Sequence, residues 1–161
     1  MKRNELQAEF DRLSFQIGSV RDQIGKAPDE LTALASQQVC VSLCGSLEQS
    51  LKRIFVGYAR ARSDNRIFRP IEKACESYQN PKTTKILELV GLFDAEFERD
   101  LRQFWDSEGE IERDHLNNLV DDRIVIAHRK RPHVNVSTGK LTNYYKAYEG
   151  LLERVFDHFL T

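Results

Sequence analysis

The residue types in this sequence that are best suited to chemistry are an arginine and a histidine five positions apart, Arg123 and His128. Three apolar residues before them form the stripe of a predicted helix: Leu116, Leu119 and Val120. Arg123 falls in the same stripe, where a buried charge costs free energy unless it is paired or lies at a functional surface. Arginine keeps its proton and presents phosphate with a planar fork of donors, and histidine transfers protons near neutral pH. The pair could therefore act on a phosphate ester.

The two side chains converge only if the helix ends close to Ala127, because five residues place them about 140° apart around an ideal α-helix. The segment HRKRPH, residues 128–133, predicts such an end. Basic residues are favoured at a helix C-terminus, and proline cannot continue the helix. The alternative is structural: Arg123 packs its stem and reaches solvent or pairs with an acid of another helix, and His128 caps the helix end.

Apolar residues recur at helical spacing nearly throughout the chain. A first helix is predicted within residues 1–27, where GKAP breaks it, and the longest helix follows and ends at RSDNR. The two stripes consist of Leu6, Phe10, Leu13, Ile17, Val20 and Ile24, and of Val39, Leu43, Leu47, Leu51, Ile54, Phe55 and Tyr58. The second helix is apolar on much of its circumference and belongs in the centre of a bundle. We expect one all-α domain over residues 1–161, with a core bundle over 28–161.

Start and stop residues predict the remaining helices. One helix follows Pro70 and stops at YQNP, and the last helix follows the turn RPHVNVSTG. The predicted N-caps are Asn80 (with Pro81 in the first turn), Asp94, Ser107 (with Glu110 in an S-x-x-E box) and Thr138. The helix that leads to His128 is thereby the penultimate one.

The composition is that of an ordinary soluble globular domain. The chain has 161 residues, of which 40% are hydrophobic and 30% charged, and this length allows one real core. No apolar run approaches the roughly 18 residues that cross a bilayer, and the charged N-terminus is not typical of a secretory signal. The cysteines, Cys40, Cys44 and Cys75, are expected to be reduced and packed, which points to a cytoplasmic protein.

No pattern in the sequence indicates a cofactor or a metal site. It has no phosphate-binding loop and no G-x-G-x-x-G, and the pair His128 and His133 straddles a proline without a third ligand nearby. The net charge of −1 excludes a general polyanion binder, so nucleic-acid contact must come from local patches. One patch is the arginine-rich stretch 53–69, for which a solvated face is the alternative, and the other is 129–133.

Arg123-x4-His128 at the end of the penultimate helix of a small all-α domain resembles the R-x4-6-H motif of HEPN domains. The segments VCVSLCGSLEQSLKRIFVGYARARS, QNPKTTKILELVGLFD and LNNLVDDRIVIAH resemble those of the RiboL-PSP-type HEPN group. The resemblance runs from about Gln37 to the C-terminus. Two positions depart from the family pattern: Ile124 stands where a polar residue, often asparagine, follows the arginine, and Arg129 stands where a small residue often follows the histidine.

The resemblance implies a metal-independent endoribonuclease without a cofactor, in a HEPN-like bundle whose last helix follows the motif. Many such enzymes are toxins or defence effectors, so an antitoxin or regulatory partner protein is expected as well. Arg123 and His128 would be the catalytic pair, with the 2′-hydroxyl of RNA as nucleophile and with 2′,3′-cyclic phosphate and 5′-hydroxyl ends as products. The active site would be composite, between the protomers of a homodimer. The residues expected to hold RNA phosphates at its mouth are Arg129, Lys130, Arg131 and His133.

Two acids could support the pair. Glu48, on the longest predicted helix, could orient Arg123 or His128, or it could face outward. Asp122 could pair with a base across the dimer, or it could be solvated. Two other functions stay open: a non-catalytic HEPN-like module that binds RNA or protein, which the two departures from the family pattern favour, and a plain helical interaction domain in which the pair is structural.

Overall fold

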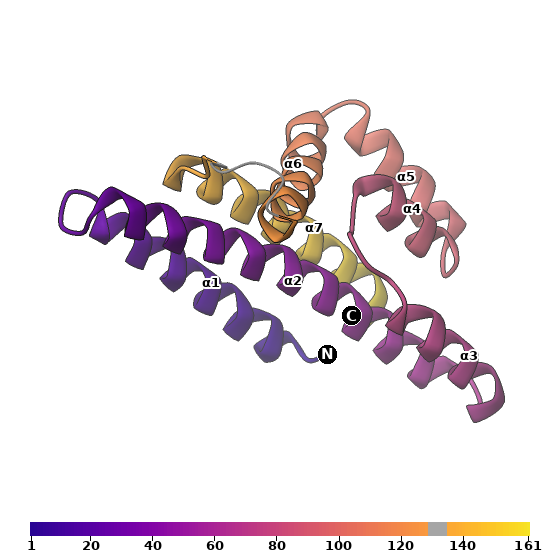
Figure 1. Cartoon of the computed structure of the whole chain (residues 1–161). Helices are drawn as coiled ribbons and strands as arrows, with labels where there is room; N and C mark the ends of the chain where they lie inside the picture. The colour runs from indigo at the N-terminus through magenta and orange to yellow at the C-terminus, as the bar shows by residue number, and fades with distance from the viewer. Residues whose placement is uncertain (129–134) are drawn as a thin grey trace.

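Seven α-helices make up the part of the chain that the computed structural model describes, residues 1–128 and 135–161, and this part contains no strand (Figure 1). The helices are α1 (Arg3–Gln23), α2 (Asp29–Arg62), α3 (Asn65–Glu76), α4 (Thr83–Gly91), α5 (Ala95–Trp105), α6 (Glu110–Ala127) and α7 (Thr138–Leu160). The predicted all-α fold is confirmed. None of the described helices combines the length and the apolar character that a membrane span needs.

The three longest helices, α1, α2 and α7, pack against one another along their lengths (Figure 1). α1 turns back into α2 through Gly25, whose φ of 74° is a left-handed conformation that glycine adopts without steric cost. One polar side chain from each helix contributes to a buried chain of hydrogen bonds. The Ser46 hydroxyl donates to Glu9 and lies 3.0 Å from the hydroxyl of Tyr148. These contacts fix the three helices relative to one another.

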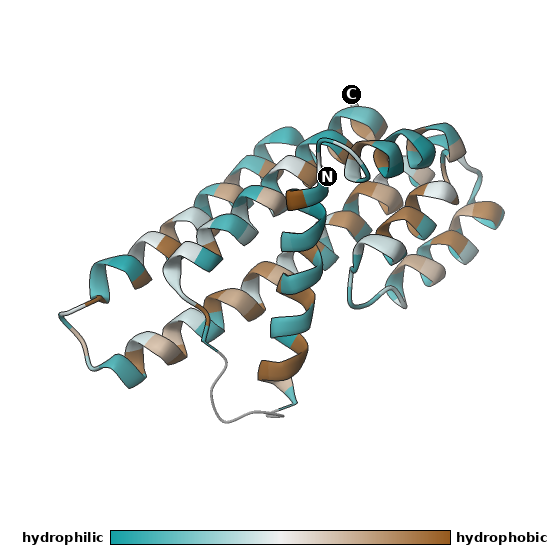
Figure 2. Cartoon of the chain, turned by 90° about the horizontal axis from the view of Figure 1, so that it is seen from above, coloured by the Kyte–Doolittle hydropathy of each residue, from teal (hydrophilic) through white to brown (hydrophobic). Residues whose placement is uncertain are grey.

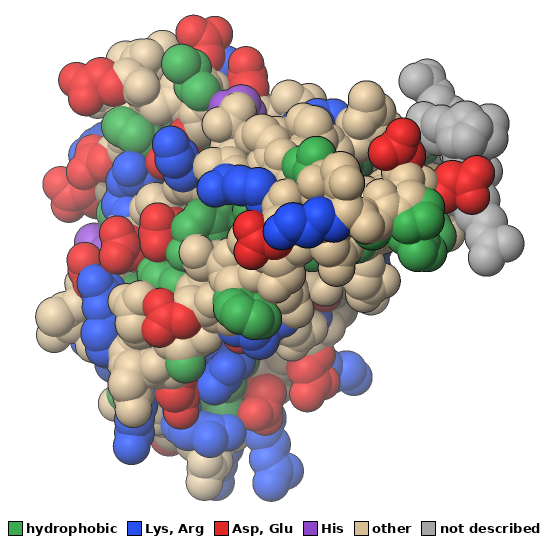
Figure 3. Space-filling model, turned by 90° about the vertical axis from the view of Figure 1, so that its left-hand side faces the viewer, with side chains coloured by type: hydrophobic (Ala, Val, Ile, Leu, Met, Phe, Trp, Pro, Cys, Tyr) green, Lys and Arg blue, Asp and Glu red, His purple; other side chains and the backbone are tan. Residues whose placement is uncertain are grey.

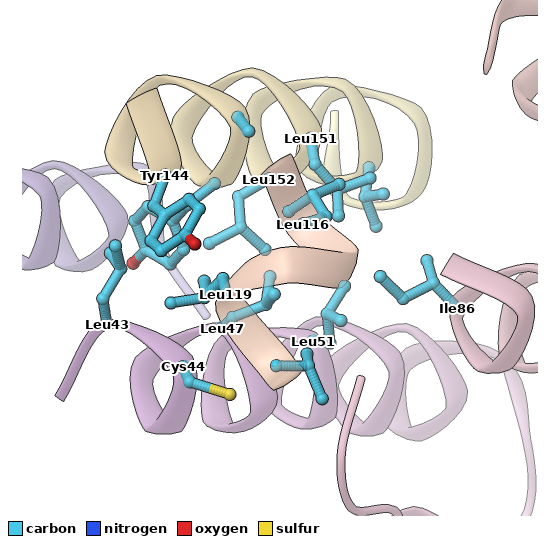
Figure 4. Close-up of a cluster of buried hydrophobic side chains, with 14 of the residues drawn as sticks. Leu43, Cys44, Leu47, Leu51, Ile86, Leu116, Leu119, Tyr144, Leu151 and Leu152 are labelled. Atoms are coloured by element: carbon cyan, nitrogen blue, oxygen red, sulfur yellow. The ribbon is translucent and has the colours of Figure 1, made fainter. Parts of the chain in front are cut away.

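Helix α6 crosses between α2 and α7 and passes through the centre of the core (Figure 4). The predicted stripe is confirmed, since Leu116, Leu119 and Val120 have no exposed surface. Fully buried leucines of the two neighbouring helices surround it: Leu47 and Leu51 from α2, and Leu151 and Leu152 from α7. Burial of one such side chain is worth roughly 1.5–3 kcal/mol, so this crossing holds α6 firmly up to Val120.

The hairpin of α4 and α5 packs on α6. Asp94 caps α5 as predicted, because its carboxylate accepts hydrogen bonds of 3.0 Å from the backbone amides of Glu96 and Phe97. At the other end of α5, the indole N–H of Trp105 donates a hydrogen bond of 2.9 Å to Glu112 of α6. The hairpin is thereby anchored next to the first half of α6.

Helix α3 begins earlier than predicted, at Asn65. Asp64 caps it by accepting hydrogen bonds of 2.8 and 3.2 Å from the amides of Arg66 and Ile67. Pro70 does not start the helix but lies inside it, where its ring nitrogen cannot donate to a carbonyl of the preceding turn. The prediction was wrong because it took the proline as the start signal and overlooked the aspartate cap.

Three further cap predictions are wrong. Asn80 is not the N-cap of α4, which begins at Thr83. Ser107 is not the N-cap of α6, since Gly109 takes that position and the Ser107 hydroxyl donates to the carbonyl of α5 behind it. The cap of α7 is Ser137, one residue before the predicted Thr138. The cap positions fall on Lys82, Gly109 and Ser137, and of these only the Ser137 side chain accepts a capping hydrogen bond.

The three cysteines are buried and free, as predicted. Burial raises the pKa of the Cys40 thiol to about 12 and that of Cys44 to about 11. Burial also raises the pKa of Cys75. The thiolate is the reactive form of cysteine, so these residues serve packing rather than nucleophilic chemistry.

Candidate functional site

Arg123 is half-buried on α6, three residues past the fully buried Val120. Its Nη1 donates a hydrogen bond of 3.2 Å to Oδ1 of Asn80, in the segment that joins α3 to α4. Burial raises the pKa of Cys44 on α2, and the positive charge of Arg123 opposes that effect across the space between the two helices. The arginine therefore lies where α6, α2 and the α3–α4 segment meet, on the helix face that its spacing predicts.

Asn80 is held in an unusual backbone conformation. Its φ of 54° is in the left-handed region, which asparagine tolerates better than most residues. Its amide N–H donates a hydrogen bond of 3.3 Å to Oε2 of Glu48, and its carbonyl accepts one of 2.7 Å from the amide of Lys82. The backbone of Asn80 is thus bonded on both sides, and its side chain is directed at Arg123.

Glu48 lies inward, with only 16% of its side chain exposed. Its Oε1 pairs with Lys52 at 3.1 Å, and Lys52 also donates to the carbonyl of Glu76 at the end of α3. Of the two alternatives that the sequence leaves open, the inward one is the arrangement found. Glu48 makes no direct hydrogen bond to Arg123 among the described residues; it accepts the backbone N–H of Asn80, whose side chain bonds the arginine.

Three acids either precede Arg123 directly in the chain or bond the backbone of Asn80, and each of the three pairs with a lysine. The pairs are Glu48 with Lys52 (3.1 Å), Asp121 with Lys82 (2.7 Å) and Asp122 with Lys140 (2.6 Å). Within residues 1–128 and 135–161, no carboxylate forms an ion pair with Arg123. The guanidinium is therefore half-buried and held by a neutral amide, and its charge is not compensated by an acid.

Asp122 has two partners in its own chain. Besides Lys140, the hydroxyl of Tyr144 donates a hydrogen bond of 2.8 Å to the same carboxylate oxygen. The side chain of Asp122 is largely buried, with 17% exposed. It is thus not simply solvated, and within the described chain it joins α6 to the start of α7.

His128 takes the C-cap position of α6, so the helix ends at Ala127 as the sequence predicts. Its backbone has φ of −93° and ψ of 2°, and its amide donates to the carbonyl of Ile124 at 3.1 Å. The imidazole is exposed, and no hydrogen bond or ion pair of it occurs among the described residues. One chain therefore places Arg123 and His128 at the same end of α6 without joining their side chains.

The end of α6 around the pair is apolar. Ile124 and Ile126 pack in part against the core and are half-exposed, as is Val125 between them, and the hydropathy of the helix end is visible in Figure 2. The predicted phosphate-binding residues, Arg129, Lys130, Arg131 and His133, lie outside the described residues.

The arginine-rich stretch 53–69 is engaged within the chain. Its contacts include Arg53 with Glu5 (3.1 Å), Arg60 with Glu72 (3.4 Å) and Arg62 over the ring of Tyr58 (4.1 Å to the centroid). Figure 3 draws the opposite side of the molecule, that of the α1–α2 turn, where basic and acidic side chains are likewise interspersed. These contacts favour the interpretation of this stretch as a solvated structural face.

A cavity of about 500 Å³ lies between α3 and α4, and neither Arg123 nor His128 lines it. Its lining is mostly apolar and includes Cys75, Leu89 and Phe93. Tyr78 also lines it, but the hydroxyl of Tyr78 is buried and has no hydrogen-bond partner within the described chain. In that same part of the chain, no group of three or more His, Cys, Asp or Glu residues is arranged to hold a metal ion.

The chain matches no protein-family model, no curated protein and no solved structure. The geometry of the site is therefore the basis for a functional argument, together with the sequence motif. Asn80 is the site residue that sequence reasoning missed, since it was assigned to a helix cap. The available signal was the residue type alone, since asparagine tolerates a left-handed backbone better than most residues.

Proposed function

We propose that this protein is a metal-independent endoribonuclease of the HEPN type, with Arg123 and His128 as its catalytic pair. The observation that carries the proposal is the state of Arg123. It is half-buried, it is hydrogen-bonded to the neutral amide of Asn80, and the acids around it are paired with lysines. A positive charge that is held by a neutral amide and paired with no acid of the described chain is suited to bind an anion such as a phosphate.

The two side chains divide the chemistry of RNA cleavage between them. The 2′-hydroxyl of RNA attacks the adjacent phosphorus, the bond to the 5′-oxygen breaks, and a 2′,3′-cyclic phosphate and a 5′-hydroxyl remain. His128, exposed at the end of α6, takes the proton of the 2′-hydroxyl or returns one to the 5′-oxygen. Arg123 stabilises the negative charge that grows on the phosphorus oxygens. DNA lacks the nucleophile and is not cleaved.

One chain contributes one histidine, whereas the reaction needs a base and an acid on opposite sides of the phosphorus. We propose that a two-fold dimer supplies both, with the two α6 ends facing one another. The half-exposed apolar residues Ile124, Val125 and Ile126 flank the pair and supply contact area for a second copy. Arg129, Lys130, Arg131 and His133 are proposed to bind the flanking phosphates of the RNA.

The biological setting is part of the same proposal. The buried free thiols agree with a reducing compartment such as the cytoplasm. A role as a toxin or defence effector, with an antitoxin or regulatory partner protein, rests on the family resemblance alone.

A non-catalytic RNA- or protein-binding module is the second candidate. The observation that favours it is that no hydrogen bond joins the imidazole of His128 to Arg123 within the described chain. Such a module would bind phosphate or a partner at Arg123 without cleaving RNA.

The deciding experiment is incubation of the purified protein with mixed RNA in excess EDTA, followed by analysis of the cut ends. We expect 2′,3′-cyclic phosphates from the wild type and none from Arg123→Lys or His128→Gln. His115→Gln, another histidine substitution on α6, serves as the matched control and should cleave like the wild type. Intact RNA with every variant folded would favour the binding module, and a gel shift with the same RNA would test it.

A further inference from the structure

We propose that Asn80 is a positioning residue for Arg123, one that fixes the guanidinium while leaving its charge free for phosphate. This proposal rests on the proposed function, since it assigns Arg123 to phosphate binding. It adds a residue that lies outside the R-x4-H motif and to which the resemblance assigns no role. It follows from one hydrogen bond, from the backbone that holds Asn80, and from the charges around both residues.

The hydrogen bond between Arg123 and Asn80 determines which edge of the guanidinium keeps its N–H donors available for a ligand. Arginine has five N–H donors, and Nη1 of Arg123 donates to Oδ1 of Asn80 at 3.2 Å. No other hydrogen bond of the Arg123 side chain occurs within residues 1–128 and 135–161. Among the described residues, the edge formed by Nε and Nη2 is therefore unbonded, and two parallel donors of this kind match two oxygens of a phosphate.

The position of Asn80 is fixed independently of Arg123. Glu48 accepts its amide N–H, and the neighbouring Lys82 pairs with Asp121 at 2.7 Å. One residue further, the amide and hydroxyl of Thr83 donate to Oδ1 of Asn117 at 3.0 and 3.1 Å. The segment is thus tied to α2 on one side and to α6 on the other, so the Asn80 amide oxygen is a fixed point for the arginine.

The neutrality of Asn80 matters as much as its position. A carboxylate at the same place would also hold Nη1, but it would neutralise the charge that attracts phosphate. Lys52, Lys82 and Lys140 pair with three acids of this region, and none of these acids forms an ion pair with the arginine. The site therefore combines a fixed guanidinium with an uncompensated charge, which is the arrangement that an oxyanion in a transition state requires.

The substitution Asn80→Asp separates these two properties. It keeps the shape of the side chain, its acceptor oxygen and its tolerance of a left-handed backbone, but it adds a negative charge. Asn80→Gly keeps the backbone conformation and removes the acceptor. The matched control is Asn118→Asp, the same change at an exposed position of α6.

The readout that does not depend on catalysis is a titration with inorganic phosphate, followed by NMR of arginine Nε–H groups. The Arg123 signal is assigned by its loss in Arg123→Lys. We expect phosphate to shift it in the wild type and in Asn118→Asp, and to bind at least about tenfold more weakly to Asn80→Asp. Equal phosphate affinity of wild type and Asn80→Asp would overturn the proposal, as would a wild-type Arg123 signal that does not respond to phosphate.

RNA cleavage provides the second readout. We expect Asn80→Gly to lower kcat with little change in KM, because the guanidinium keeps its charge but loses its orientation. If the wild type cleaves RNA and Asn80→Gly has the same kcat, the positioning role of Asn80 is overturned, whereas the proposed ribonuclease function is supported. If the wild type binds phosphate at Arg123 but leaves RNA intact, the proposed ribonuclease function is wrong. The phosphate titration then remains the test of the positioning role of Asn80.

Discussion

The hydroxyl of Tyr144 donates a hydrogen bond of 2.8 Å to Asp122, the residue that directly precedes Arg123. Lys140 pairs with the same carboxylate oxygen at 2.6 Å. Burial raises the pKa of Tyr144, and the hydrogen bond to Asp122 raises it further, so the phenol remains a donor at any physiological pH. Since Tyr144 and Lys140 both lie on α7, this carboxylate joins the C-terminal part of α6 to the helix that follows it.

We expect Tyr144→Phe to lower the free energy of unfolding by about 1–3 kcal/mol, because a hydrogen bond to a charged group is lost while the ring volume is kept. Urea denaturation measures the change. Tyr58→Phe is the control, since no hydrogen bond of the Tyr58 hydroxyl occurs in the described chain. Equal losses in the two variants would show that the bond to Asp122 contributes nothing of its own.

Gly109 is the N-cap of α6, and a side chain there would collide with Phe104. A Cβ built on Gly109 would lie 2.3 Å from Cε1 of the Phe104 ring. We expect Gly109→Ala to destabilise the fold by about 1–3 kcal/mol through overpacking, measured as a lower urea midpoint. Gly45→Ala, inside α2 and with open space around the new Cβ, is expected to stabilise by up to about 1 kcal/mol. A stable Gly109→Ala variant would mean that the ring of Phe104 moves aside at little cost.

Asp94 makes the stability of the fold depend on pH in the acid range. Hydrogen bonds from the Phe97 amide and from His158 are the main causes that lower the pKa of Asp94 below its ordinary value of 3.8. Between the two pKa values the unfolded chain therefore binds more protons than the folded one. The contribution of the Asp94 carboxylate to the free energy of unfolding is full above about pH 4, and it is lost as the pH falls through the lowered pKa.

The substitution Asp94→Asn keeps the cap and removes the charge. We expect Asp94→Asn to be less stable than the wild type at pH 7, and we expect the difference to disappear near pH 2. Thermal melts of both proteins at pH 7, 5, 4 and 2 measure it. A difference that stays constant over this range would contradict the role of the Asp94 charge.

The helices could be predicted from the sequence because their stripes are long and regular, as the buried Leu116 and Leu119 of α6 show. Their boundaries were harder to predict because two neighbouring residues often compete for one cap. Ser137 took the place of the predicted Thr138 in this way. Such a competition is decided by backbone geometry within one turn, which a spacing pattern does not contain.

The spacing of the apolar residues also predicted the position of Arg123 in the stripe. It did not predict Asn80 as the hydrogen-bond partner of Arg123. Asn80 lies 43 residues away along the chain and reaches Arg123 only because the α3–α4 segment folds over α2. The inward orientation of Glu48 likewise depends on that segment, since the amide it accepts belongs to Asn80. Contacts between distant segments follow from the tertiary packing and leave no periodic signal in the sequence.

The state of Arg123 predicts a conflict between stability and function. A half-buried charge without an acid costs free energy, so Arg123→Met is expected to raise the free energy of unfolding by about 0.5–2 kcal/mol. The same variant should lose phosphate binding and RNA cleavage. Arg154→Met is the matched control, because Arg154 pairs with Glu112 at 3.0 Å and its removal leaves a largely buried carboxylate short of a partner.

We therefore expect the two arginine variants to change stability in opposite directions in urea denaturation. A loss of stability in Arg123→Met similar to that in Arg154→Met would mean that Arg123 is a structural residue, held by contacts that a methionine cannot replace. A gain in stability together with the loss of phosphate binding would show that the fold keeps an unfavourable charge at this position for its function.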